Sequence, residues 1–201
     1  MRELLPGVWH WTTQHPNIGQ EVSSYLLRES AAVLDPMVPG EGLVAFDGLP
    51  TPNHVVLSCR HHDRDHAQFV QSFGASLHVS EKGVKEYPGE DVSPYAVGDE
   101  FVPGITAVAN GPIAPDDMVL RIEVEGGALV FADSVINADG GPGFVPDGLL
   151  GDDPAQVRAD ITAAVRELLD TQEFEHVLFA HGDPIVGEGR EALAALVQNP
   201  R

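Results

Sequence analysis

Positive charge is scarce in this sequence of 201 residues. It has 11 lysines and arginines against 31 aspartates and glutamates, a formal net charge of −20 and a pI of about 4.5. Such a surface repels the phosphates of nucleic acids and the headgroups of anionic membranes, so we expect neither as a partner. We attribute the acidity to solubility and not to an acidic-ligand role.

Cysteine and long apolar runs are also scarce. The single cysteine, Cys59, excludes an intramolecular disulfide. The opening segment MRELLPGVWHWTT lacks the apolar core of a signal peptide, and no window reaches the length of a membrane span, which predicts a cytoplasmic location. Cys59 is a candidate nucleophile or ligand, but free cysteines are most often buried packing residues, and we favour that interpretation.

The first half of the chain predicts strands followed by a βαβ unit. Strand patterns occur at residues 5–12, 22–28, 29–37, 53–59 and 76–80. Residues 65–74 have a helical period that ends at Gly74, between the last two of these strands. No internal repeat or low-complexity linker divides the sequence, so we expect one domain, residues 1–201.

The second half predicts a hairpin and a second βα unit. Gly126-Gly127 joins two alternating runs within residues 116–135, a strong hairpin signal. Helices are expected at 154–170, with Asp153 as its N-cap, and at 189–198, on either side of a strand at 175–180. The Gly/Pro-rich segment 137–153 is typical of a lid or binding loop. Its four large apolar residues either cover a pocket or form a homodimer contact: Phe144, Val145, Leu149 and Leu150.

Histidine and aspartate are concentrated in residues 57–69, LSCRHHDRDHAQF, directly after the strand that ends near Cys59. Imidazole and carboxylate are the usual ligands of zinc, iron or manganese, although a solvated polar loop would explain a single cluster equally well. His62 and His66 are four residues apart, as in a zinc-binding helix, but the apolar run before them favours a strand.

Two distant residues favour the metal hypothesis. Asp133 follows the strand ALVF, and His181 follows the strand HVLFA. An isolated Asp or His at a strand end is usually a cap or a turn residue. Here three strands each end in ligand-type residues, and this recurrence predicts that they converge on one site.

These segments resemble the metallo-β-lactamase-fold superfamily of metal-dependent hydrolases. The similarity covers nearly the whole chain: SSYLLRESAAVLDP, VVLSCRHHDRDH, ALVFADSVI and LFAHGDPI followed by GREAL. It implies an α/β fold, an αββα four-layer sandwich of two mixed β-sheets with helices outside. It also implies a metal site with ligands from the loop motif and the later strands: His61, Asp65, His66, Asp133 and His181. Asp35 would be a supporting or structural residue.

The chain departs from the family pattern at two places. The second histidine of the loop motif is Asp63, and the segment before the central hairpin, AVANGPIAPDDM, has Asn110 or Ile113 where the family has a histidine. The resemblance therefore implies one complete site and the remnant of a second, in which His61 and Asp63 remain.

The resulting prediction is a hydrolase with one divalent metal ion, zinc first and iron or manganese as alternatives. A metal ion lowers the pKa of a bound water, which is the chemistry of metal-assisted hydrolysis. The expected substrate is a small molecule: an ester, thioester, lactone or phosphoester. Asp65, His61 and Asp63 are the candidate catalytic residues. Two alternatives stay open, a non-catalytic binding or regulatory protein of the same fold and an iron-dependent redox enzyme.

Overall fold

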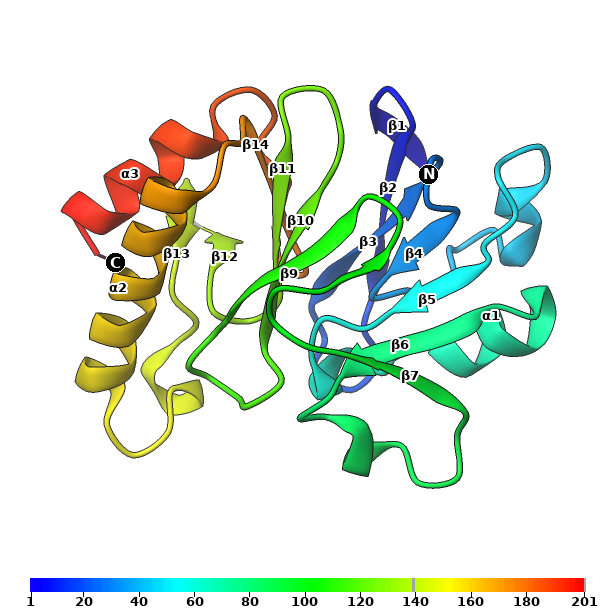
Figure 1. Cartoon of the computed structure of the whole chain (residues 1–201), viewed down its shortest axis with the longest axis horizontal. Helices are drawn as coiled ribbons and strands as arrows, with labels where there is room; N and C mark the ends of the chain where they lie inside the picture. The colour runs from blue at the N-terminus through cyan, green and yellow to red at the C-terminus, as the bar shows by residue number, and fades with distance from the viewer. Residues whose placement is uncertain (139, 201) are drawn as a thin grey trace.

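Two β-sheets face each other, with helices on the outer side of each, in a computed structural model that describes residues 1–138 and 140–200 (Figure 1). The seven strands of the first sheet follow chain order: β1 (Arg2–Leu5), β2 (Val8–Gln14), β3 (Glu21–Leu27), β4 (Ala32–Leu34), β5 (His54–Val56), β6 (Ser76–Ser80) and β7 (Val92–Tyr95). They pair antiparallel up to β4 and parallel from β4 to β7.

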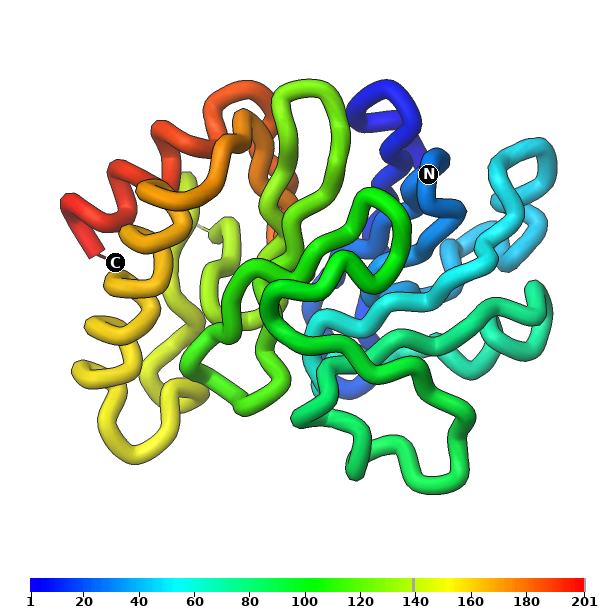
Figure 2. Tube along the Cα trace, in the orientation of Figure 1, coloured from blue at the N-terminus to red at the C-terminus, as the bar shows by residue number. Residues whose placement is uncertain are grey.

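The second sheet has five strands in the order β14 (His176–Phe179), β11 (Ala128–Phe131), β10 (Met118–Ile122), β9 (Ile105–Asn110) and β8 (Glu100–Val102). Only β11 and β14 pair in parallel within this sheet as described. A separate hairpin joins β12 (Ile136–Ala138) and β13 (Gly141–Gly143). The tube in Figure 2 runs from the first half of the sandwich, where the N-terminus lies, to the second, where the chain ends.

Within the described residues, three α-helices and four short 3-10 helices complete the fold. The α-helices are α1 (His66–Phe73), α2 (Pro154–Thr171) and α3 (Gly189–Gln198); the 3-10 helices are η1 (Leu43–Phe46), η2 (Arg60–His62), η3 (Val84–Glu86) and η4 (Asp147–Leu149). Asp153 caps α2 by accepting a hydrogen bond from the Gln156 amide, and Gly74 ends α1 in the left-handed conformation. The predicted helices, the central hairpin and the βαβ unit are confirmed.

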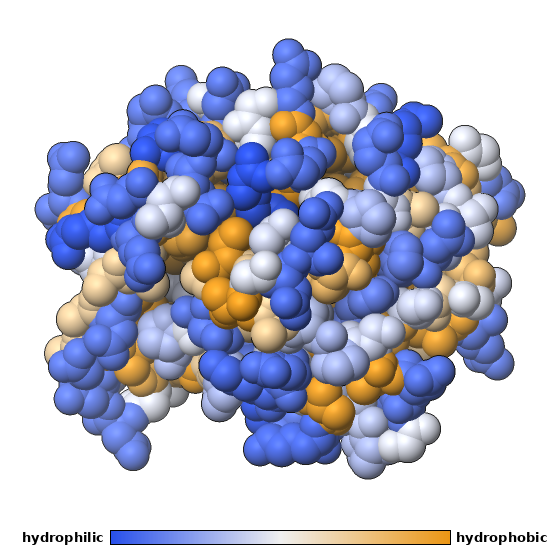
Figure 3. Space-filling view, viewed as in Figure 1, coloured by the Kyte–Doolittle hydropathy of each residue, from blue (hydrophilic) through white to orange (hydrophobic). Residues whose placement is uncertain are grey.

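Three apolar clusters separate the layers. Tyr25 and Leu120 belong to the cluster between the sheets, Phe69 to the cluster beneath α1, and Val165 to the cluster beneath α2 and α3. This arrangement confirms the predicted αββα sandwich. The visible surface is mostly hydrophilic, with small separate apolar areas (Figure 3). None of the described helices is both long and apolar enough to span a bilayer.

The segment 137–153, predicted as a lid or binding loop, contributes both to the core and to the wall of a cavity. Phe144, Val145 and Leu150 are buried in the cluster beneath α2, because that helix presents an apolar face that the segment helps to cover. Leu149 alone of the four apolar residues remains exposed, at 66%. The three buried residues therefore pack α2 against the second sheet, whereas Asn137, Ala138, Gly140, Gly141 and Pro142 line a cavity beside α3.

A histidine pair lies on the inner face of the first sheet. His54 Nδ1 is 3.0 Å from His78 Nε2, and the His78 ring lies near Phe101. Burial and the neighbouring His54 lower the pKa of His78 from 6.5 to about 4. Burial also lowers the pKa of His54. The folded protein thus binds protons here less readily than the unfolded chain.

We expect this pair to make folding stability depend on pH. Because the pKa of His78 is lower in the folded state, its contribution is intact above pH 6.5 and is lost progressively as the pH falls toward 4, by up to about 3 kcal/mol. Urea unfolding of the wild type and of His78→Leu between pH 7.5 and 4.5 should give a shallower dependence in the variant. His15→Leu, in the loop after β2, is the control, and equal slopes for all three proteins would contradict the prediction.

Candidate metal centre

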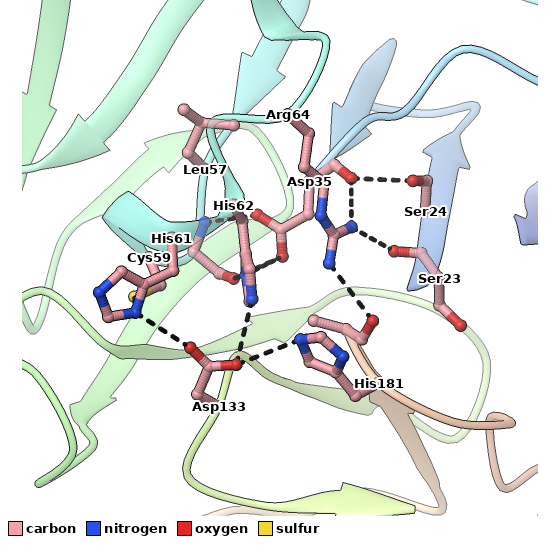
Figure 4. A network of polar contacts seen from close by, with 12 residues as sticks. Ser23, Ser24, Asp35, Leu57, Cys59, His61, His62, Arg64, Asp133 and His181 are labelled. Atoms are coloured by element: carbon pink, nitrogen blue, oxygen red, sulfur yellow. Dashed lines mark hydrogen bonds and ion pairs between the residues drawn. The ribbon is translucent and has the colours of Figure 1, made fainter. Parts of the chain in front are cut away.

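Three ligand-type side chains from the ends of three strands converge between the two sheets (Figure 4). His62 lies in η2 after β5, Asp133 follows β11, and His181 follows β14. Parallel pairing of β11 with β14 brings the ends of these two strands to the same edge of the second sheet. The turn after β5 faces this edge from the first sheet. The three residues are therefore close in space although they lie far apart in the sequence.

The three side chains meet at one carboxylate oxygen. Oδ1 of Asp133 is 3.2 Å from His62 Nε2 and 3.3 Å from His181 Nε2, and the ligand atoms of the three residues all lie within 4.8 Å of one another. Two donors that each lie ~2.1 Å from one tetrahedral zinc are about 3.4 Å apart. Two imidazole nitrogens and a carboxylate at these separations fit one divalent ion with little rearrangement.

The opposite side of the His62 ring is fixed by buried partners. His62 Nδ1 is 3.1 Å from Asp35 Oδ2 and 3.1 Å from Ser58 Oγ, and the Ser58 amide donates to Asp35 Oδ1. Asp35 and His62 are each only 2% exposed. A carboxylate that accepts the Nδ1 proton leaves the Nε2 lone pair for a metal, which is the usual support for a histidine ligand.

Electrostatic interactions hold His62, Asp133 and their neighbours together. Although burial opposes ionisation of Asp133, the charge of His62 and hydrogen bonds from His181 and His61 outweigh it and lower the pKa of Asp133 far below its usual range. Burial likewise disfavours a charged His62, but Asp133 and Asp35 raise the pKa of His62 to about 9. The two carboxylates therefore create a strong local demand for positive charge, which a divalent ion meets.

A second group uses the other oxygen of the same carboxylate. His61 Nδ1 is 3.5 Å from Asp133 Oδ2 and 3.7 Å from Cys59 Sγ, and these three residues also satisfy the separations of a metal site. Burial raises the pKa of the Cys59 thiol, and Cys59 packs against Ala114 and Ala132. A neutral thiol in apolar surroundings is a poor ligand, so this group is the weaker candidate, in keeping with the packing role expected for Cys59.

Asp117 holds the backbone of Asp133 and the side chain of Ser134 by hydrogen bonds. Its Oδ1 accepts a hydrogen bond from the Asp133 amide, and its Oδ2 accepts one from Ser134 Oγ. Burial raises the pKa of Asp117 to about 7. This residue fixes the backbone that carries the central carboxylate.

The structure brings only some of the predicted ligands together. Asp133 lies near two of them, with His181 at its Oδ1 and His61 at its Oδ2. Asp65 Oδ2 instead accepts a hydrogen bond from the Val38 amide, and His66 lies 2.9 Å from Glu90 and edge-on to Tyr87. The predicted cage of Asp65, His66, Asp133 and His181 is therefore not assembled in the described structure.

The reason for this difference is the position at which α1 begins. His66 is the first residue of α1, and its side chain is buried on the same helical face as Phe69 and Val70, three and four residues later. That face turns toward the first sheet and away from Asp133. Asp63, a predicted catalytic residue, is exposed and accepts a hydrogen bond from the Arg64 amide.

His62 is the ligand that the sequence analysis did not select. The four-residue spacing of His62 and His66 drew attention to it, but as part of a helical motif. In the structure the two histidines belong to different elements, η2 and α1. Of the two residues considered for the position of the family's further histidine, the partly buried Ile113 packs on the apolar cluster beneath α2, and Asn110 accepts a hydrogen bond from Lys82.

Comparison with protein-family models and with curated proteins gives no match. Among solved structures, the chain superposes on a metallo-β-lactamase family protein of Thermus thermophilus with a TM-score of 0.69, at 17% identity, over 98% of this chain and 80% of that one. Rubredoxin oxygen:oxidoreductase of Desulfovibrio gigas gives a TM-score of 0.71 at 16% identity, over 98% of this chain. A flavo di-iron protein of Thermotoga maritima gives 0.64 at 17% identity, over 94%.

The chain has the metallo-β-lactamase fold. It spans 60% of the Desulfovibrio chain and 57% of the Thermotoga chain, so it corresponds to part of each. In this metallo-β-lactamase fold, His62, Asp133 and His181 form a candidate metal site between the sheets.

Gly182, next to His181, has no room for a side chain. It adopts a φ of +93°, and a Cβ there would lie 1.8 Å from the Asn137 carbonyl oxygen. The Asn137 backbone amide in turn donates a hydrogen bond to the His181 carbonyl. The close approach of these two segments therefore sets where the backbone of His181 lies.

We expect Gly182→Ala to lower the free energy of unfolding by more than about 2 kcal/mol and to weaken zinc binding, because the clash must displace the His181 backbone. Chemical denaturation and zinc titration measure both effects. Gly187→Ala is the control: it has a φ of +85° but no atom within 4 Å of the new Cβ, so it should cost only about 1 kcal/mol and leave zinc affinity unchanged. Equal behaviour of the two variants would contradict the prediction.

Proposed function

We propose that this chain is a metal-dependent hydrolase of a small ester, thioester, lactone or phosphoester, with one divalent ion held by His62, Asp133 and His181. The observation that carries the proposal is the convergence of two imidazole nitrogens on Asp133 Oδ1, at 3.2 and 3.3 Å. Zinc is the first candidate, because an N₂O donor set suits zinc and leaves at least one position open for water and substrate.

Each residue of the site has a separate task in this proposal. Asp35 and Ser58 fix the orientation of His62 through Nδ1, and Asp117 fixes the backbone of Asp133. His61 lies at the rim with 59% of its side chain exposed. Its Nδ1 faces Asp133, and its Nε2 is left to exchange a proton with substrate or solvent. When bound, the ion would supply Lewis-acid activation of water and of the substrate carbonyl or phosphoryl group.

A panel of p-nitrophenyl acetate, a thioester, a lactone and bis-p-nitrophenyl phosphate tests the proposal on zinc-loaded protein. We expect turnover of at least one substrate, lost on chelation, restored by zinc and reduced more than ~100-fold in His181→Ala. Asp63→Asn, which changes an exposed carboxylate outside the site, should keep wild-type turnover. Stoichiometric zinc with no turnover of any substrate would contradict a hydrolase.

The second candidate is a non-catalytic metal-binding or regulatory protein of the same fold. The observation that favours it is the apolar packing around Cys59 and Ala114, beside the segment where the family pattern has a histidine. Zinc binding without turnover would support this candidate, and turnover that depends on His181 would exclude it.

A further inference from the structure

Arg64 places a guanidinium group beside the candidate metal centre. Its Nη1 donates to the carbonyls of Ser23 at 2.8 Å and Asp35 at 2.7 Å, and its Nη2 lies 3.4 Å from the carbonyl of Ala180, the residue before His181 (Figure 4). These carbonyls come from both sheets. Arg64 therefore lies where the strand ends that carry the site approach each other.

This arrangement is unfavourable by itself. Arg64 is partly buried, and within the described residues no carboxylate lies at salt-bridge distance from its guanidinium. Carbonyl dipoles alone compensate a cation less well than a paired carboxylate does. Its backbone φ of +36° is also in the left-handed region, as is the φ of +44° at Asp35. Strain at two neighbouring site residues is typical of a functional arrangement.

The charges around the candidate site indicate why the positive charge of Arg64 matters there. Asp35 and Asp133 contribute two carboxylates, and both contact His62. With Arg64 and one divalent ion present, positive charge exceeds these two carboxylates by one. A second divalent ion would raise this excess to three charges beside the buried His62 and the largely buried Asp133, which is strongly disfavoured.

We infer that Arg64 is a fixed cation that takes the place of a second metal ion, so that this centre holds one divalent ion. The inference rests on the proposed metal site of His62, Asp133 and His181. Arg64 also acts as a positioning residue, because its contacts with Ser23, Asp35 and Ala180 join the strand ends that carry Asp35 and His181. Without its charge, the same carbonyls and the Asp35 carboxylate would be oxygen donors of the kind that Mn²⁺ prefers.

The test compares Mn²⁺ and Zn²⁺ binding by the full chain and three variants after removal of metal with a chelator. Arg64→Gln removes the charge but keeps an N–H donor, Arg64→Lys keeps the charge, and Arg28→Gln makes the same change of net charge at Trp9, away from the site. Isothermal titration and elemental analysis give stoichiometry and affinity, and electron paramagnetic resonance detects coupled Mn²⁺ pairs. Circular dichroism and melting curves establish that each variant is folded.

We expect one ion per chain in the wild type, Arg64→Lys and Arg28→Gln. Arg64→Gln should bind its first ion at least about tenfold more tightly and take up a second, with a coupled Mn²⁺ signal, because a repelling charge is gone. Two ions in the wild type, or one ion of unchanged affinity in Arg64→Gln, would overturn the inference. Equal behaviour of Arg64→Gln and Arg64→Lys would also overturn it.

Failure of the proposed function gives a different pattern. If the wild type and Arg28→Gln bind no ion, the proposed metal site is refuted. The inference would then fail with it, because Arg64 cannot take the place of a second ion in a centre that holds no first one; two ions in the wild type would instead overturn the inference alone. If Arg64→Gln does not fold, Arg64→Met gives the charge comparison with Arg64→Lys.

Discussion

Asp133→Asn is expected to abolish stoichiometric zinc binding, with a loss of affinity greater than about 100-fold, which exceeds the usual effect of removing a supporting residue. Asp133 Oδ1 is the one atom that both His62 Nε2 and His181 Nε2 approach, so the neutral amide removes the shared ligand and the charge that attracts the ion. Elemental analysis of untagged protein and competition with a chromogenic chelator measure the effect. His62→Ala should behave in the same way.

Asp65→Asn is the matched control for this result. It makes the same chemical change at a carboxylate that accepts hydrogen bonds from Val38 and Gln68 and does not face the site. It should keep one zinc with wild-type affinity. Loss of zinc in Asp65→Asn with retention in His62→Ala would contradict the ligand set seen in the structure and favour the one predicted from the sequence.

Asp35→Asn is expected to reduce zinc affinity by about 10–100-fold and the free energy of unfolding by about 3–5 kcal/mol. The buried Asp35 carboxylate accepts hydrogen bonds from Ser58 N, Ser58 Oγ and His62 Nδ1. The side-chain nitrogen of an asparagine at this position would face one of these N–H or O–H donors instead of accepting from it. His62 would also lose the negatively charged partner that orients its ring. Because asparagine tolerates the left-handed backbone of Asp35, the effect belongs to the side chain.

Zinc competition and urea unfolding of metal-free protein separate the two parts of this prediction. Asp47→Asn, an exposed aspartate at the end of η1, should change neither quantity. Unchanged zinc affinity in Asp35→Asn would show that His62 does not need this partner and would contradict the supporting role of Asp35.

The larger elements of the fold could be predicted from local sequence patterns. The βαβ unit of β5, α1 and β6 follows from an apolar strand, a helical period and Gly74, and the β10–β11 hairpin follows from Gly126-Gly127. These signals depend on residues close in sequence, so they can be recognised without knowledge of the tertiary structure. The role of Phe144 and Val145 could not be predicted in this way, because only their packing against α2 shows that they belong to the core.

The sequence by itself determined that ligand-type residues end three strands, and it selected Asp133 and His181. The tertiary structure decided which residue of the segment 60–66, RHHDRDH, lies beside Asp133 and His181. A one-residue change in where the turn ends and α1 begins redirects each side chain, and the burial of His66 with Phe69 settles that register. The same register turns His62 toward Asp133 and places the Arg64 guanidinium near the carbonyl of Ala180, the residue before His181.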